Sequence, residues 1–272
     1  MFKFGFSNEN VENETSDESQ SECVNWLESR EIKPEDVILR NHDHPNVIHC
    51  DNYDIKYISD KDIVDTLRHD GPKNDNSVLN AEQNHSDLIP AVYEGGLKIW
   101  ECTFDLLEFI KNLDLNEKRV LDLGCGGGVV GIYASLKGAT TVFQDYNKEV
   151  IKSATIPNVF LNNIASNKCR FYYGDWNSFL DLQKQTENKF DFIFTSETIY
   201  NVNNYKKILT IFRDLLHKNG EIFLAAKSHY FGVGGGIVQF EDALKKEDVF
   251  NHTTHWVCSD GLKRAIIKIS LK

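Results

Sequence analysis

The stretch Val120-Leu121-Asp122-Leu123-Gly124-Cys125-Gly126-Gly127-Gly128-Val129-Val130-Gly131 decides the fold of this 272-residue chain. An apolar strand over residues 119–123 runs into a glycine-rich turn, and a helix is expected over residues 129–136. Such a turn needs glycine because the chain reverses sharply and its backbone approaches a ligand without an intervening Cβ atom. Strand, glycine turn and helix in this order predict a nucleotide-binding α/β domain.

The segments after this turn alternate between strand and helix patterns. Strands are expected over residues 140–144, 170–173, 190–195 and 221–226. The last two strands, 255–258 and 264–271, are close enough in sequence to form a hairpin. Helices are expected over residues 103–113, 149–162 (interrupted near Pro157), 205–216 (closed by Asn219-Gly220) and 237–246. The alternation predicts a doubly wound, Rossmann-like sheet of seven strands.

The first part of the chain has a different texture. Residues 7–22 are polar and acidic, and Phe2, Phe4 and Phe6 alternate before them as in a short strand or a docking peptide. Residues 54–59 have a strand pattern, whereas residues 71–87 are polar and loop-like. We therefore expect an irregular, partly disordered extension over residues 1–89 and the nucleotide-binding domain over residues 90–272.

Charge and composition exclude several classes of protein. The formal net charge of −11 argues against direct nucleic-acid binding, although it permits a basic partner; solubility is the simpler explanation. We find no apolar run of 18 residues and no secretion signal, so no membrane span is expected. Six cysteines without C-x-x-C spacing indicate a reducing compartment, the cytoplasm or nucleus. The spacing of His42, His44, His49 and Cys50 fits no structural zinc pattern, so no metal is expected.

Two further turns follow predicted strands of the sheet. Asp145 ends the second strand, where a carboxylate can accept hydrogen bonds from both ribose hydroxyls of a cofactor; the alternative is a solvated turn residue. Gly174-Asp175-Trp176 follows the third strand, although Trp176 could be plain core. Both turns support nucleotide binding without deciding between cofactors.

The register of the glycines bears on the cofactor. Read from Gly126, the sequence matches the G-x-G-x-x-G pattern of dehydrogenases through Gly128 and Gly131, but the turn would then start two residues late. The form Asp122-Leu123-Gly124-Cys125-Gly126 instead resembles motif I of class I methyltransferases, in which a Gly-x-Gly contacts the methionine part of S-adenosylmethionine. We therefore favour a methyltransferase over a dehydrogenase.

Longer stretches carry a more specific resemblance. Residues 94–103 (EGGLKIWECT), 144–147 (QDYN), 174–176 (GDW), 196–200 (SETIY) and 227–236 (KSHYFGVGGG), with the opening Phe4-Gly5-Phe6, resemble the protein-histidine N-methyltransferases that act on the large-subunit ribosomal protein L-three. The similarity covers residue 90 to the C-terminus well and the first ninety residues poorly. Close relatives methylate lysine, so the acceptor is the less certain part.

The resemblance implies a set of S-adenosylmethionine contacts and a protein substrate. Residues 99–103 would close over the cofactor, the glycine turn would line its methionine side, and residues 144–146 and 174–176 would hold the ribose and adenine. Ser196 would lie next to the methyl group. The implied cofactor-binding residues are Ile99, Trp100, Glu101, Cys102, Thr103, Gly124, Gly126, Gln144, Asp145, Tyr146, Gly174, Asp175, Trp176 and Ser196.

The acceptor determines what else the site must supply. A lysine with a pKa of about 10.4 must lose a proton near neutral pH, whereas a histidine with a pKa of about 6.5 is already mostly neutral. One polar side chain that orients the imidazole ring would suffice. We predict Glu197 as this catalytic residue; it could instead cap the following turn, and His229 is a competitor. The loop of residues 232–236 is either a wall of the substrate entrance or a tight turn.

The sequence thus predicts a monomeric, S-adenosylmethionine-dependent protein-histidine N-methyltransferase of the cytoplasm and nucleus, acting on ribosomal protein L-three. Two alternatives stay open. One is a protein-lysine or small-molecule methyltransferase on the same scaffold. The other is a module that binds a ribosomal protein and retains a vestigial cofactor site, against which the intact glycine turn and Asp145 argue.

Overall fold

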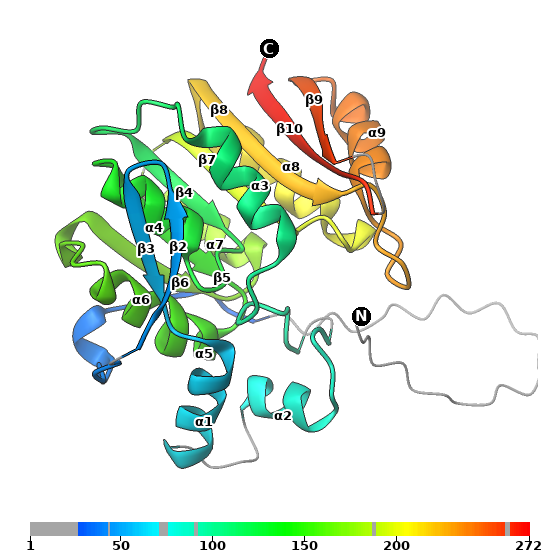
Figure 1. Cartoon of the computed structure of the whole chain (residues 1–272). Helices are drawn as coiled ribbons and strands as arrows, with labels where there is room; N and C mark the ends of the chain where they lie inside the picture. The colour runs from blue at the N-terminus through cyan, green and yellow to red at the C-terminus, as the bar shows by residue number, and fades with distance from the viewer. Residues whose placement is uncertain (1–26, 43, 71–75, 90–91, 187–188, 259–261) are drawn as a thin grey trace, which may run out of the picture.

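The computed structural model describes residues 27–42, 44–70, 76–89, 92–186, 189–258 and 262–272 (Figure 1). The expectations for Phe2, Phe4 and Phe6 and for residues 7–22 lie outside these residues, and so does the predicted boundary at residue 90. Among the described residues, no helical segment combines the length and the hydrophobicity that a membrane span requires.

Eight of the described strands form one sheet, in the order β1-β6-β5-β4-β7-β8-β10-β9 (Figure 1). Neighbouring strands from β6 to β8 run parallel, and β10 and β9 add an antiparallel hairpin at one end. The predicted α/β fold with its seven strands is therefore confirmed. The seven are β4 (Arg119–Leu123), β5 (Thr140–Asp145), β6 (Cys169–Tyr173), β7 (Phe190–Ser196), β8 (Leu216–Lys227), β9 (Phe250–Cys258) and β10 (Arg264–Leu271).

Both faces of the sheet are covered, because successive side chains of a strand point to opposite sides. Ile193 of β7 packs into the cluster beneath one set of helices, and its neighbour Phe194 packs into the cluster beneath the other. The first set is α7 (Trp176–Lys184), α8 (Tyr205–Leu215) and α9 (Ile237–Glu247); the second includes α3 (Glu101–Ile110), α4 (Val129–Leu136) and α6 (Ile156–Leu161). Short 3-10 turns lie at Pro34–Asp36, Ser166–Lys168 and Val202–Asn204.

Two predicted elements differ in detail from the structure. The helix expected over residues 149–162 consists of α5 (Lys148–Val150), a π-helical turn (Ile151–Thr155) and α6. Pro157 has no N–H to donate, and the wider turn precedes it. Strand β8 begins at Leu216, so Asn219-Gly220 lies inside it, where its pairing with β7 shifts register.

The extension is more regular than predicted. Strand β1 (Arg30–Ile32) pairs antiparallel with β6 and becomes the eighth strand, while β2 (Asn46–Cys50) and β3 (Tyr53–Tyr57) form a hairpin that includes the strand expected near residue 54. Helices α1 (Asp60–Asp70) and α2 (Ser77–Gln83) follow, so the expectation of a loop over residues 71–87 is wrong for its described second half.

Tertiary packing explains this regularity. Ile48 and Ile55 of the hairpin are buried against α3 and α4 of the domain. Helix α2 buries Val78 and Leu79, and the Asn76 side chain accepts hydrogen bonds from their two backbone N–H groups. These apolar stretches are too short to form a core of their own, and they become ordered only against the larger domain.

Candidate functional site

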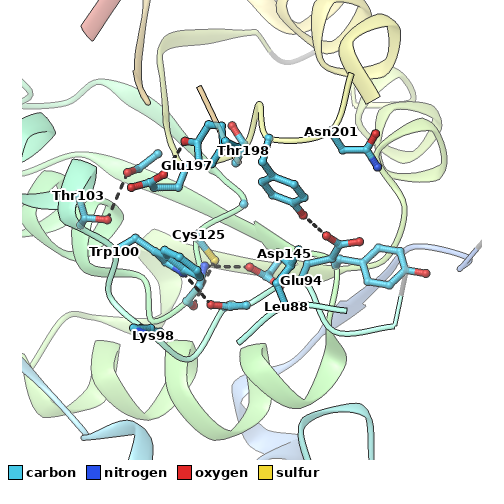
Figure 2. A pocket seen from close by; sticks show the side chains of 18 of the residues that line it. Leu88, Glu94, Lys98, Trp100, Thr103, Cys125, Asp145, Glu197, Thr198 and Asn201 are labelled. Carbon is cyan, nitrogen blue, oxygen red and sulfur yellow. Dashed lines mark hydrogen bonds between the residues drawn. The ribbon is translucent and has the colours of Figure 1, made fainter. Parts of the chain in front are cut away.

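A cavity of about 840 Å³ opens where the carboxyl ends of β4, β5 and β7 meet (Figure 2). The strand order reverses direction at β4, which has β5 on one side and β7 on the other. Open α/β sheets bind their ligands at this kind of switch point. We distinguish two ends of the cavity by their carboxylates: the Asp145 end, with Gly126, Asp145 and Trp176, and the Glu197 end, with Trp100, Glu197, Lys227 and Tyr230.

The glycine turn and Asp145 are joined directly. The Gly126 N–H donates to Asp145 Oδ2 over 2.9 Å, and the Asn147 N–H donates to Oδ1 over 3.1 Å. A Cβ atom on Gly126, whose φ is +52°, would lie 2.6 Å from the carbonyl oxygen of Gly96. The turn therefore leaves no room for a side chain, and the carboxylate is held in one position facing the cavity.

Asp145 is buried, which excludes its interpretation as a solvated turn residue. Burial raises the pKa of its carboxyl group from 3.8 to about 6, while the backbone N–H donors act in the opposite direction. Nearby Asp122 accepts a hydrogen bond from the Gly131 N–H, and burial raises its pKa to about 8. Burial thus disfavours the ionised form of Asp122 more than that of Asp145.

Behind Asp145, a chain of hydrogen bonds fixes the turn after β6. The Trp176 indole N–H donates to Gln144 Oε1 over 2.8 Å, and the Gln144 amide donates to the Gly174 carbonyl over 2.9 Å. Trp176, Asp175 and Tyr146 line the cavity, whereas Gln144 and Gly174 lie behind them. Gln144 and Gly174, predicted as direct cofactor contacts, do not line the cavity, and their hydrogen bonds hold Trp176 in position.

Asp175 lines the cavity, and its carboxylate also accepts hydrogen bonds from two other residues. One carboxylate oxygen accepts from the Asn177 N–H at the start of α7, and the other accepts from Lys207 Nζ over 2.6 Å. A Cβ atom on Gly174, whose φ is +111°, would lie 2.5 Å from Ser29 Cα, just before β1. The Asp175 N–H donates to the Leu27 carbonyl. The extension therefore supports this wall of the cavity.

The segment before and within α3 forms the opposite wall. Ile99, Trp100 and Thr103 line the cavity, and the Trp100 indole N–H donates to the Gly95 carbonyl over 3.0 Å. The Thr103 hydroxyl (Figure 2) donates to Ser196 Oγ, and Ser196 and Gly124 also line the cavity. The intervening Glu101 and Cys102 point elsewhere because one turn of a helix presents only part of its circumference. The Glu101 carboxylate pairs with Lys227, and Cys102 is buried in the core.

Glu197 stands at the centre of the Glu197 end. Its backbone is left-handed (φ +61°), and its side chain is buried. Oε1 accepts from the Cys102 N–H over 3.3 Å and lies 3.5 Å from Lys227 Nζ, while Oε2 accepts from the Tyr230 hydroxyl over 2.5 Å. Its side chain therefore bonds to the start of α3 rather than capping the turn that follows it.

Lys227 and Tyr230 are functional candidates that we did not identify from sequence. Burial and the Glu197 carboxylate both raise the pKa of the Tyr230 hydroxyl, which stays protonated and donates to Glu197. The Tyr200 ring lies edge-on to the Tyr230 ring, with centroids 6.2 Å apart, and the Tyr200 hydroxyl donates to Glu94. The signal for Lys227 and Tyr230 was the stretch of residues 227–236, which carried the family resemblance without indicating a role for either side chain.

His229 and the loop of residues 232–236, whose roles the sequence left open, lie near the cavity entrance. The His229 ring lies edge-on to Phe231, with centroids 5.0 Å apart, and both line the outer part of the cavity. In this segment the lining ends at Phe231. The loop that follows closes on itself, because the Tyr230 N–H donates to the Gly235 carbonyl. The Gly235 N–H donates to the Tyr200 carbonyl and so attaches the loop to the segment after β7. The loop is a tight turn rather than a cavity wall.

The cluster of His42, His44, His49 and Cys50 is divided by the hairpin. His49 and Cys50 are adjacent on β2, so they point to opposite faces. His49 is exposed and pairs with Asp54, whereas Cys50 is buried, with Sγ 3.8 Å from the Leu107 carbonyl.

Sequence comparisons place these features among known proteins. A family model described as a methyltransferase domain matches residues 114–258. The histidine protein methyltransferase 1 homolog of Bos taurus is 41% identical over 236 residues, which are 76% of this chain and 63% of the relative. The homolog of Dictyostelium discoideum is 44% identical over 191 residues, which are 69% and 61% of the two chains. This chain thus spans less than two thirds of these relatives.

Among solved structures, a methyltransferase complexed with SAH superposes with a TM-score of 0.57 at 12% identity. The superposition covers 85% of this chain and 57% of the other. At this identity the likeness concerns the fold alone. It agrees with the doubly wound sheet.

Proposed function

Because the chain belongs to the family of methyltransferase domains, we propose that it methylates a histidine side chain of a protein, with S-adenosylmethionine as the methyl donor. The observation that carries the proposal is the pairing of two unlike ends in one cavity. A turn shaped for a nucleoside lies at the Asp145 end, and a buried carboxylate with fixed donors lies at the Glu197 end.

The residues of the Asp145 end fit an adenosine group. Asp145 has two oxygens, each already holding one backbone N–H, and an ionised carboxylate oxygen can accept more than one hydrogen bond. It would accept the ribose hydroxyls, while Trp176 would cover the adenine ring. Ser196 and Gly124 would line the methionine part. S-adenosylmethionine, when bound there, supplies a methyl group on a positively charged sulfur.

The residues of the Glu197 end fit an imidazole acceptor. A neutral imidazole has one nitrogen with a lone pair and one that carries a proton. Glu197 would accept the N–H and so present the other nitrogen to the methyl donor. The positive charge that develops on the ring would be stabilised by the same carboxylate, to which the proton can then pass. Tyr230 and Cys102 keep the carboxylate in place without rearrangement.

The proposal also names the protein substrate that carries the acceptor histidine. The relatives named histidine protein methyltransferase support a protein histidine as the acceptor. We take the large-subunit ribosomal protein L-three as the substrate on the resemblance of residues 94–103 and 227–236, and the acidic net charge of −11 would favour its encounter with a basic protein. We also propose that the enzyme is monomeric and acts in the cytoplasm and nucleus.

Labelling with an identified product tests this function. The full chain is incubated with radiolabelled S-adenosylmethionine and purified, unmethylated L-three, and the product is hydrolysed and separated. We expect label in methylhistidine. Label confined to methyllysine would overturn the histidine assignment and leave the methyltransferase class intact. Binding of S-adenosylhomocysteine without any transfer, on L-three or on a ribosomal protein mixture, would favour a binding module instead.

A further inference from the structure

The most unusual charge in the cavity is the ammonium group of Lys227, the last residue of β8. Its side chain is only 4% exposed, and it lines the Glu197 end. Nζ lies 3.0 Å from Glu101 Oε2 and 3.5 Å from Glu197 Oε1. It also lies over two aromatic rings, 5.2 Å from the centroid of Trp100 and 5.8 Å from that of Tyr230. These contacts hold the ammonium group between two carboxylates and two aromatic rings, inside the wall that faces the acceptor.

Lys98 provides a contrast on the same aromatic ring. Its Nζ lies 5.5 Å from the Trp100 centroid, but its side chain is 42% exposed and pairs with Asp87. Solvent and salt screen such a surface charge, whereas they screen a buried one much less. Of these two lysines, Lys227 is therefore the one whose charge an acceptor inside the cavity would experience.

The charges around Lys227 determine what can enter. Glu197 is buried like Lys227, and the two form a compact pair of opposite charges. Glu101 is half exposed, so solvent screens its carboxylate. The Glu197 oxygens already accept from Cys102 and Tyr230. A neutral imidazole can join this arrangement through one hydrogen bond, but an ammonium group would bring a second positive charge beside the first.

We infer that Lys227 determines acceptor selectivity, admitting the neutral imidazole of a histidine and excluding the charged side chain of a lysine. This inference rests on the proposed function. Two ammonium groups a few ångströms apart repel each other strongly where solvent is excluded. At neutral pH a free lysine side chain carries a positive charge as it approaches the site, whereas a free histidine side chain is mostly neutral. Lys227 thus acts before the transfer, at entry.

The experiment compares two acceptors that differ at one position. Mass spectrometry first locates the methylated histidine in L-three, and a second L-three is made with lysine at that position. Wild-type enzyme and the variants Lys227→Gln, Lys227→Met and Lys227→Arg are assayed on both proteins. We expect the ratio of kcat/KM for lysine to that for histidine to rise about tenfold or more in the Gln and Met variants. The Arg variant, which keeps the charge, should retain the wild-type ratio.

Controls distinguish a change in acceptor selectivity from a loss of folding or cofactor binding. Lys98→Met removes the exposed charge on the same Trp100 ring and should leave the ratio unchanged. S-adenosylhomocysteine affinity and melting temperature show which variants are folded; Gln can still donate to Glu197 where Met cannot, so the two neutral variants do not share one folding risk. An unchanged ratio in a folded neutral variant overturns the inference while the proposed function stands. If the wild-type enzyme labels neither acceptor, this result contradicts the proposed function and, with it, the inference.

Discussion

The Asp145 end and the Glu197 end of the cavity are built from different kinds of segments of the chain. The Asp145 end consists largely of turns that directly follow β4, β5 and β6, and its key bond joins Gly126 to Asp145 through a backbone N–H. The Glu197 end joins side chains from three distant segments, around Trp100, Glu197 and Lys227. The first can be recognised as local motifs, whereas the second exists only once the sheet brings β7 and β8 together beside α3.

Substitutions at one end should therefore leave the function of the other end intact. Substitutions at the Glu197 end should lower the rate of transfer while S-adenosylhomocysteine still binds. Substitutions at the Asp145 end should weaken binding of that ligand.

Glu197→Gln should have the largest effect. The amide keeps the size of the side chain but loses the charge that stabilises the imidazolium and receives its proton, so kcat should fall about 100-fold or more. S-adenosylhomocysteine affinity, measured by calorimetry, should stay within about threefold of wild type, a change smaller than 1 kcal/mol. A large loss of affinity in this variant would show that the two ends are not separable.

Asp145→Asn should weaken cofactor binding and is the counterpart of the first prediction. Hydrogen bonds to an ionised carboxylate contribute about 1.5–3 kcal/mol, so the dissociation constant of S-adenosylhomocysteine should rise about 10- to 150-fold. At saturating cofactor, kcat should be much less affected than in Glu197→Gln. A variant with unchanged affinity would contradict the role of Asp145 in holding the ribose.

The pH dependence of binding should report the same carboxylate. Because the pKa of Asp145 is raised to about 6, the group is ionised at pH 7.5 and becomes protonated as the pH falls through 6. The protonated form accepts hydrogen bonds less well, so affinity should be constant above pH 7 and should fall by up to about tenfold per pH unit below pH 6. In Asp145→Asn this decline should disappear; its persistence would assign it to another group.

Gly174→Ala should have the smallest effect on the site and a clear effect on stability. Residue 174 would keep a strained backbone conformation (φ +111°), which costs about 1–3 kcal/mol. The new Cβ atom would also lie 2.5 Å from Ser29 Cα, and this clash adds to the cost. Gly234→Ala is the matched control, since φ there is +92° but its Cβ atom would lie in open space. That control carries only the conformational cost of about 1–2 kcal/mol. Thermal unfolding should therefore rank Gly174→Ala below Gly234→Ala, and equal melting temperatures would mean that the segment before β1 does not support the wall.

The sequence by itself determined the features that depend on neighbouring residues. The turn Gly124-Cys125-Gly126 after an apolar strand specified the doubly wound sheet, since few conformations let a chain reverse there and approach a ligand. Asp145, at the end of the next strand, followed from the same logic, because parallel strands end at one edge of a sheet. Glu197 followed from the fourth strand in the same way, although its hydrogen-bond partners did not.

Only the tertiary structure decided which side chains face the cavity and which support it. Glu101 and Cys102 belong to the predicted contact segment, but the turn of α3 directs one toward Lys227 and the other into the core. Gln144 lies behind Trp176, and β1 of the extension became ordered against β6. Lys227 acquires its environment from Glu101, Glu197 and Trp100, which are far from it in sequence. Burial and charge pairing depend on such distant contacts, and local pattern does not encode them.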